Sequence, residues 1–192
     1  MLFKNDYLAA VGVTQATYTG NQLAAKRICE IYNSARRGKI SHVLGSELWT
    51  SFFAPLIPQF SELPATQAHY DSFATNQMLQ LASLLRQRQK GDFGLAHKML
   101  NLFLKDHWAL STLTPHSETL LHLPLDHNLL SKLVTIPPPW ATWTKVVVTH
   151  STQEHVVGSY LEIQSKFRIF WQRIAPRFAS PIEMDQFIWH RI

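Results

Sequence analysis

A glycine-containing break between two amphipathic stretches restricts the fold of this chain more than any other feature. Residues 66–90 carry apolar side chains at helical spacing, and Thr66 is suited to cap the helix that they predict. The segment 91–94 (GDFG) interrupts this spacing, and residues 95–108 resume it. The order predicts a helix, a tight hairpin turn and a second helix over residues 66–108.

Most of the remaining chain also shows helical spacing. Residues 23–38, 126–133 and 156–174 each carry an apolar stripe, and a last helix is expected from Ser180 onward. The prolines at 137–139 are expected to end the second of these helices.

Three segments lack a long helical pattern. Prolines divide residues 48–60 into predicted short helices or turns, and a loop is expected around Pro115. Residues 140–150 (WATWTKVVVTH) predict one strand or an extended loop. The expected fold is therefore all-α, a single helical domain over residues 1–192 with at most a minor extended element.

The composition is that of a globular, moderately basic protein. The 192 residues are 46% hydrophobic, and 18 Lys and Arg residues against 13 Asp and Glu residues give a net charge of +5. This charge attracts phosphate backbones, although many basic proteins bind no nucleic acid. The single cysteine, Cys29, excludes an internal disulfide and cysteine-rich zinc sites. Because no apolar run is long enough to span a membrane and no cleavable signal is evident, we expect a soluble, cytoplasmic protein.

Ten histidines raise the question of a metal site. The densest grouping with an acid, His116, His122, Asp126 and His127, matches no zinc-binding spacing. The sequence also lacks a GxxxxGK[ST] phosphate loop and a GxSxG motif. We therefore predict neither a metal nor an organic cofactor.

The start of the second hairpin helix, residues 94–98 (GLAHK), is a candidate DNA contact. Small side chains at Gly94 and Ala96 would let a phosphate approach the backbone amides. His97 is in the same turn, and Lys105 lies further along the helix. We predict that these four residues bind DNA.

Two residues are candidates for chemistry. Apolar neighbours around Lys98 would exclude water and lower its pKa, and a neutral lysine amine can attack a sugar carbon and form a Schiff base. Asp126 has a fixed charge that could activate an attacking group or stabilise positive charge on a sugar ring. The structural alternatives are a surface lysine on an amphipathic helix and a helix N-cap.

Together these motifs resemble the helix-hairpin-helix DNA glycosylases of the 8-oxoguanine branch. Residues 94–98 are similar to that family's G-hydrophobic-G-x-K hairpin, and residues 124–128 (PLDHN) to its P-V-D-x-H stretch, in the same order. The resemblance covers roughly residues 66–134. It departs from the family at Ala96, at His127 and in a longer connection between the motifs, and the family's N-terminal β domain is absent, which would make this a minimal version.

The resemblance implies a DNA glycosylase that flips a damaged or modified base out of double-stranded DNA. Lys98 would be the nucleophile and Asp126 the assisting carboxylate, the chain would act as a monomer, and β-elimination of the strand could follow. The role could be DNA repair or defence against modified phage DNA. The alternative is a non-catalytic helical DNA-binding or protein-interaction module that uses Lys98 only for phosphate contact.

A flipped base also needs stacking partners and phosphate contacts. The predicted base pocket consists of Phe93, His127, Phe187 and Trp189. The predicted phosphate contacts of the C-terminal region are Lys166, Arg173 and Arg177. The alternative for these basic residues is the solvated face of an amphipathic helix.

Overall fold

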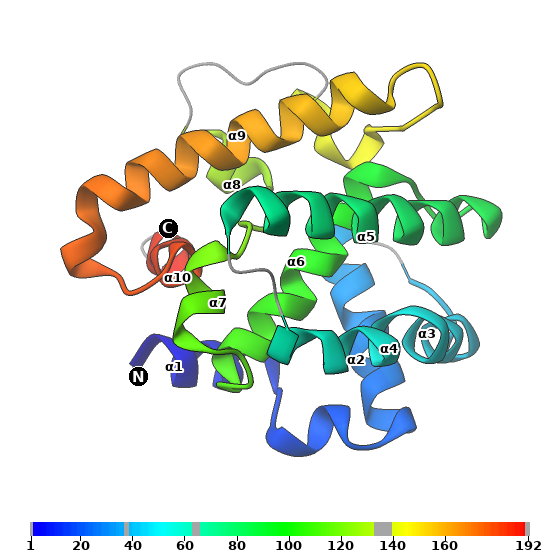
Figure 1. Cartoon of the computed structure of the whole chain (residues 1–192). Helices are drawn as coiled ribbons and strands as arrows, with labels where there is room; N and C mark the ends of the chain where they lie inside the picture. The colour runs from blue at the N-terminus through cyan, green and yellow to red at the C-terminus, as the bar shows by residue number, and fades with distance from the viewer. Residues whose placement is uncertain (1, 37–38, 63–65, 133–139, 191–192) are drawn as a thin grey trace.

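All regular structure in the described part of the chain is helical. The protein's computed structural model describes residues 2–36, 39–62, 66–132 and 140–190. No strand occurs in these ranges, which confirms the all-α prediction (Figure 1). The predicted helix ends at Gly38 and at residues 133–139 lie outside the described residues.

The helices vary widely in length. The described α-helices are α1 (Leu2–Val11), α2 (Asn21–Arg36), α3 (His42–Leu48), α4 (Ala54–Leu56), α5 (Gln67–Gln87), α6 (Phe93–Ala109), α7 (Pro115–Leu120), α8 (His127–Leu130), α9 (Gln153–Ile174) and α10 (Pro181–His190). The short turns are η1 (Gln15–Tyr18), η2 (Trp49–Phe53), η3 (Ile57–Glu62), η4 (Trp140–Lys145) and η5 (Ala175–Arg177); η2 is π-helical and the others are 3-10.

Local sequence signals start the long helices where they were predicted. The Thr66 side chain caps α5 by accepting a hydrogen bond from the amide of His69, and α6 follows α5 across the short turn 88–92. Ser180 likewise accepts a hydrogen bond from the amide of Glu183 at the start of α10. The hairpin of two helices over residues 66–108 is therefore present.

Three segments differ from the prediction. Helix α7 replaces the loop expected around Pro115, because Thr114 caps it and proline is favoured in a first turn. The 3-10 turn η4 replaces the first half of the strand or loop expected over residues 140–150, and an extended segment without strand pairing follows it. Helix α8 ends at Leu130, before the expected end at residue 133.

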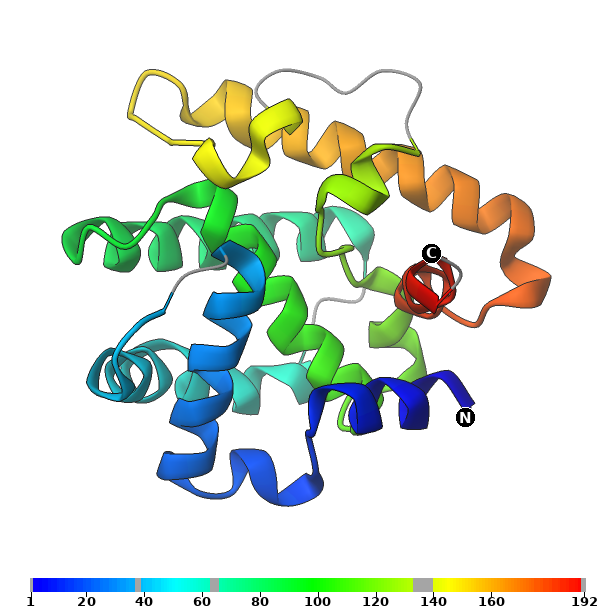
Figure 2. The ribbon, with the colours of Figure 1, turned by 180° about the vertical axis from the view of Figure 1, so that it is seen from behind.

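Helix α6 runs through the middle of the molecule and positions the candidate site. It packs against α1, α2, α5 and η4, which surround it in Figures 1 and 2. Nearly all of its side chains are buried, including those of Lys98, Lys105 and Asp106. Because a buried charge is costly without a partner, it matters that each of these three forms an ion pair.

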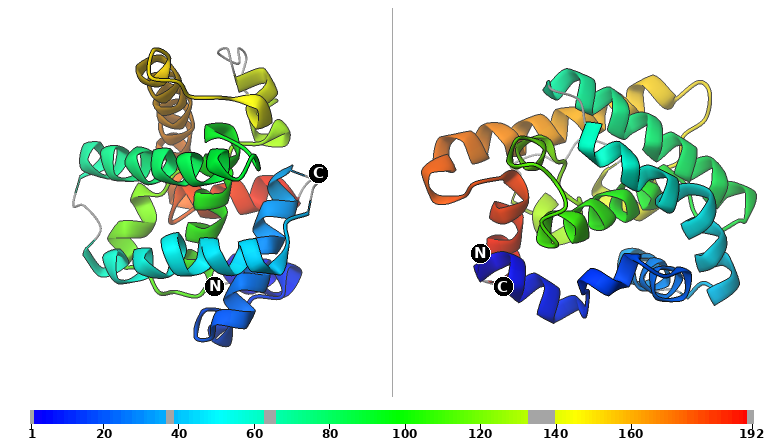
Figure 3. Two further views of the ribbon diagram at one scale, coloured as in Figure 1. Left: turned by 90° about the vertical axis from the view of Figure 1, so that its right-hand side faces the viewer. Right: turned by 60° about the horizontal axis from the view of Figure 1, so that its bottom comes forward.

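The two ends of the described chain meet beside α6. Helices α1 and α10 lie side by side, whereas α9 lies along an outer edge, away from α1 and α2 (Figure 3). None of the helices that the structure describes has both the length and the apolar character needed to cross a lipid bilayer.

Candidate active site

A pocket of ≈ 310 Å³ opens between α1, α2, α6 and α10. It lies on the side of the molecule seen in Figure 2, where α6 is visible between these helices and α8. Part of its wall is aliphatic and part is charged. The aliphatic part consists of Ala10, Val11 and Leu102, and the charged part of Arg27, Lys98, Lys105 and Asp126. The pocket therefore offers both an apolar surface and reactive groups.

Lys98 and Asp126 meet at this pocket, although the chain between them is long. The Lys98 Nζ lies 3.4 Å from Asp126 Oδ2, and both side chains are more than nine-tenths buried. The second carboxylate oxygen, Oδ1, accepts a hydrogen bond from the amide of Leu129 at 3.0 Å and so caps α8. The same aspartate therefore acts as a helix cap and as the partner of the lysine.

Burial changes the proton affinity of the Lys98 amine. Desolvation lowers the pKa of Lys98 below its usual range, while the charge and hydrogen bond of Asp126 act in the opposite direction. The ring of Trp143 lies 4.7 Å from Nζ and covers one side of the amine. A lysine in this environment loses its proton more readily than a surface lysine does.

The segment that carries Asp126 is held by buried side chains. Gln164 of α9 binds Leu123 twice: its Oε1 accepts from the Leu123 amide and its Nε2 donates to the Leu123 carbonyl, each at 2.9 Å. Asn101 of α6 donates to the same carbonyl at 3.2 Å. Because these contacts fix the backbone just before Asp126, the carboxylate has a defined position relative to α6.

Two further ion pairs surround the pocket behind Lys98. Lys105, two helical turns along the same face of α6, lies 2.7 Å from Asp185 of α10. Arg27 of α2 binds Asp106 of α6 through Nε at 2.7 Å and Nη2 at 2.8 Å. Because these pairs join α2, α6 and α10 around the pocket, they stabilise its walls.

Gly94 lets residues 143–146, at the end of η4, cross the start of α6. Its amide donates to the carbonyl of Val146 at 2.9 Å, and a Cβ at this position would lie 1.8 Å from the carbonyl oxygen of Trp143. Only a glycine permits so close an approach. The crossing places the Trp143 ring beside Lys98.

Replacement of Gly94 by alanine is expected to lower the free energy of unfolding by about 1–3 kcal/mol, because η4 has to move away from α6 to accommodate the new Cβ. Urea denaturation followed by circular dichroism measures the effect. Gly158→Ala is the matched control, since Gly158 is exposed on α9 and a Cβ added there would have no neighbouring atom within 4 Å. It is expected to raise stability by about 0.5–1 kcal/mol. Equal stability of Gly94→Ala and the wild type would contradict the tight crossing.

The structure corrects the predicted DNA contacts at the start of α6. Gly94, Ala96 and His97 are buried, and the Gly94 amide already donates to Val146. His97 Nε2 lies 3.2 Å from the Leu125 carbonyl, and burial lowers the pKa of His97 to about 3. These residues pack η4 and the segment before Asp126 against α6, so they present no exposed surface to a phosphate.

The other predicted phosphate contacts divide into two groups. Lys105 lines the pocket but is buried against Asp185, which leaves little of its charge for DNA. Lys166, Arg173 and Arg177 are exposed on α9 and η5, as a phosphate contact requires. Lys166 pairs with Glu162 at 2.6 Å, and α9 lines no part of the pocket.

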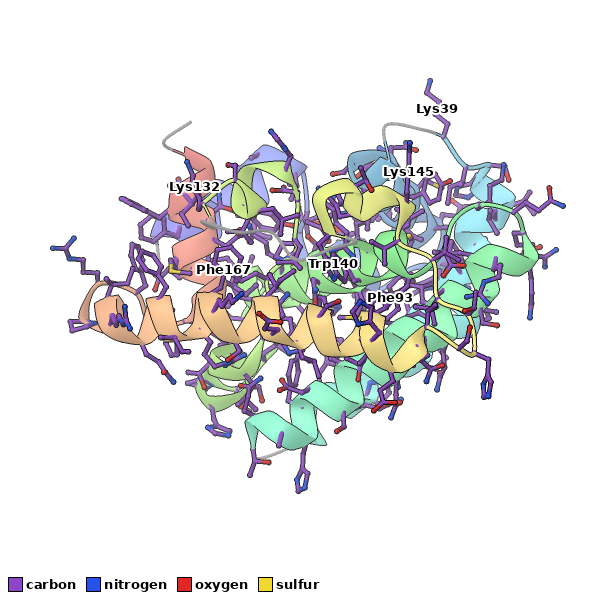
Figure 4. All side chains as sticks on the ribbon, turned by 90° about the horizontal axis from the view of Figure 1, so that it is seen from above. Lys39, Phe93, Lys132, Trp140, Lys145 and Phe167 are labelled. Atoms are coloured by element: carbon purple, nitrogen blue, oxygen red, sulfur yellow. The ribbon has the colours of Figure 1, made fainter. Side chains whose placement is uncertain are left out.

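The predicted base-pocket residues are not gathered at the pocket. Phe93 is fully buried in the core, where its ring packs against Trp140 and Tyr160 (Figure 4). His127 is exposed at the start of α8, and Phe187 packs against Phe178. Trp189 lies in α10, and its side chain is outside the described part of the structure.

The pocket instead contains residues that the sequence patterns did not single out. Tyr7 of α1, Arg27 of α2 and Gln186 of α10 all line it. They come from the two ends of the chain, and no local motif marks them. Trp143, beside the Lys98 amine, does carry a sequence signal, because an aromatic residue shortly before the valine run is a candidate for stacking.

Comparisons with other proteins leave the site to be judged on its own chemistry. Among the described residues, no cluster of His, Cys, Asp and Glu side chains could hold a metal ion. Searches against protein-family models, curated proteins and solved structures find no match to this chain.

Proposed function

We propose that this protein is a DNA glycosylase that excises a damaged or modified base, with Lys98 as the nucleophile and Asp126 as the assisting carboxylate. The observation that carries the proposal is the buried pair of Lys98 Nζ and Asp126 Oδ2, 3.4 Å apart in the wall of a pocket. Desolvation activates a lysine amine as a nucleophile, and an adjacent carboxylate can serve as its general base. The proposal also rests on the resemblance of the two motifs to the helix-hairpin-helix glycosylases.

The chemistry follows from the lowered pKa of the Lys98 amine. The Lys98 ammonium loses a proton to water, and the neutral amine attacks C1′ of the flipped nucleotide. As the Nζ–C1′ bond forms, the glycosidic C1′–N bond breaks, and its electron pair leaves with the base, which then takes up a proton. Asp126 takes a second proton from Nζ, and the C1′–O4′ bond then breaks: the nitrogen lone pair forms the C=N bond of a protonated imine while O4′ takes up a proton. Water hydrolyses this imine or β-elimination cuts the strand.

The pocket is compatible with one flipped base. Its volume of ≈ 310 Å³ is at the lower end of the range for small-molecule sites. Its aliphatic residues, Ala10, Val11 and Leu102, offer a surface for the faces of a base, while Gln186 and Tyr7 supply polar groups. An extruded base would replace water next to Lys98 and so favour the neutral amine.

Reductive trapping tests the proposal. Wild-type protein is incubated with borohydride and duplexes that carry single modified bases, beginning with oxidised guanine and including hypermodified phage bases. We expect a covalent protein–DNA adduct with at least one duplex and its loss in Lys98→Ala. Lys26→Ala is the control, since Lys26 is an exposed lysine paired with Glu30 on α2.

Two results would reject the proposal. One is the absence of both adduct and released base over the whole panel, which would reject the activity, and the other is an adduct that survives in Lys98→Ala, which would reject Lys98 as the nucleophile. In the first case, the non-catalytic DNA-binding or interaction module would be the better description.

A further inference from the structure

Three lysines from separate segments project from the side of the molecule that carries the pocket. Figure 4 shows Lys39, Lys132 and Lys145 pointing away from α5, on the side of α2, α8 and η4. Lys39 follows α2, Lys132 follows α8 and Lys145 ends η4. All three side chains are exposed. We call this set the rim lysines.

The rim lysines differ from five other lysines in their charge partners. Several lysines of the described chain pair with a carboxylate: Lys4, Lys26, Lys98, Lys105 and Lys166. Within the described residues, no rim lysine has a carboxylate within ion-pair distance. No described carboxylate therefore neutralises their charges, which are available to an anionic partner.

The chain connects two of the rim lysines closely to the catalytic pair. Lys132 stands shortly after Asp126, at the end of the turn that Asp126 caps. Lys145 stands shortly after Trp143, whose ring covers the Lys98 amine. Lys145 lines a surface hollow together with Asp92, and that carboxylate is paired with Arg86 at 2.6 Å.

We propose that Lys39, Lys132 and Lys145 hold the phosphate backbone of double-stranded DNA along the edge of the pocket. This proposal rests on the proposed function, since a flipped base reaches Lys98 only if the strand runs past the pocket opening. It assigns the phosphate contacts to these loops rather than to Lys166, Arg173 and Arg177 of α9 and η5. Three exposed lysines that have no carboxylate partner among the described residues, on one side of the molecule (Figure 4), offer positive charge to the phosphates of a strand.

The salt dependence of binding to an undamaged duplex tests the assignment. A fluorescent duplex is titrated by anisotropy at several KCl concentrations, and log Kd is plotted against log[KCl]. Replacement of all three rim lysines by glutamine is expected to lower the slope by about three, about one for each lost phosphate contact. The charge-matched control replaces Lys166, Arg173 and Arg177 by glutamine and is expected to change the slope by less than about one.

The two triple variants remove the same net charge, so a general electrostatic effect would lower both slopes equally. Equal slopes in the two variants, a larger change in the α9 variant, an unchanged slope in the rim variant or no binding by the wild type would each overturn the assignment. Far-UV circular dichroism confirms that both variants are folded. Because an undamaged duplex has no base to excise, intact binding with no trapping would reject the glycosylase alone, whereas trapping with an unchanged slope would reject the rim lysines alone.

Discussion

Replacement of Asp106 by alanine is expected to lower the free energy of unfolding by about 3–5 kcal/mol. Asp106 is completely buried in α6 and binds the Arg27 guanidinium through both carboxylate oxygens. It also accepts a hydrogen bond from the hydroxyl of Tyr7 at 2.6 Å and one from Tyr18. The substitution therefore leaves a buried positive charge and two hydroxyls without their acceptor.

The pKa values of these partners show that Asp106 stabilises their protonated forms. Burial alone would lower the pKa of Arg27, but the hydrogen bonds and charge of Asp106 outweigh it, and the pKa is raised. Burial and the neighbouring Asp106 both raise the pKa values of Tyr7 and Tyr18. All three partners therefore stay in the protonated forms that donate to Asp106 over the physiological pH range.

Urea denaturation followed by circular dichroism measures the loss. Tyr18→Phe is a milder variant that removes one hydrogen bond to the carboxylate and is expected to cost about 1.5–3 kcal/mol. Asp6→Ala is the control, because the Asp6 side chain is exposed on α1, and the expected change is within about 0.5 kcal/mol. If Asp106→Ala lost less than about 1 kcal/mol, the buried network would not be the link between α2 and α6.

The helices could be predicted because their signals are local. An apolar stripe, a capping threonine and a proline in the first turn each act within a few residues, so α5, α6 and α10 begin close to where the sequence places them. The prediction of a strand or extended loop at η4 was wrong because it also rested on local signals alone. Val146, Val147 and Val148 favour extended backbone, but a strand needs a partner, and the segment instead packs across the glycine at the start of α6.

The candidate site was predictable only in part. Lys98 and Asp126 could be named because each belongs to a short motif, and the structure brings their side chains together. Arg27, Tyr7 and Asp185 could not be named, since each is ordinary in its own helix. Arg27 and Tyr7 reach the pocket wall, and Asp185 reaches the pocket residue Lys105, only through contacts over long sequence separations. Sequence motifs report local chemistry, whereas the walls of a pocket depend on tertiary packing.

The largest effect on activity is expected from Asp126→Asn. Asparagine is as good a helix cap as aspartate, so its side-chain oxygen still accepts from the Leu129 amide and the cap of α8 is kept. What the variant loses is the negative charge beside Lys98. Without a proton acceptor and without stabilisation of the positive charge that develops on the sugar, base release under single-turnover conditions is expected to slow by about 10²–10⁴-fold.

The pH dependence separates this chemical role from a structural one. The rate rises with pH as the Lys98 ammonium loses its proton, because only the neutral amine attacks C1′. Desolvation lowers the pKa of Lys98, and Asp126 is the main opposing influence. Removal of that charge lowers the pKa of Lys98 further, so the rising limb of the rate profile should move to lower pH in Asp126→Asn while its plateau falls.

Asp126→Ala completes the comparison. It loses the same charge and also the cap of α8, so it is expected to match the slow rate of Asp126→Asn and to be less stable by about 1 kcal/mol. Single-turnover rates and urea denaturation of the two variants distinguish charge from cap. If the rising limb of the rate profile stayed in place or moved to higher pH in Asp126→Asn, the pairing with Lys98 would be contradicted. Loss of a nearby carboxylate can only make the Lys98 ammonium easier to deprotonate.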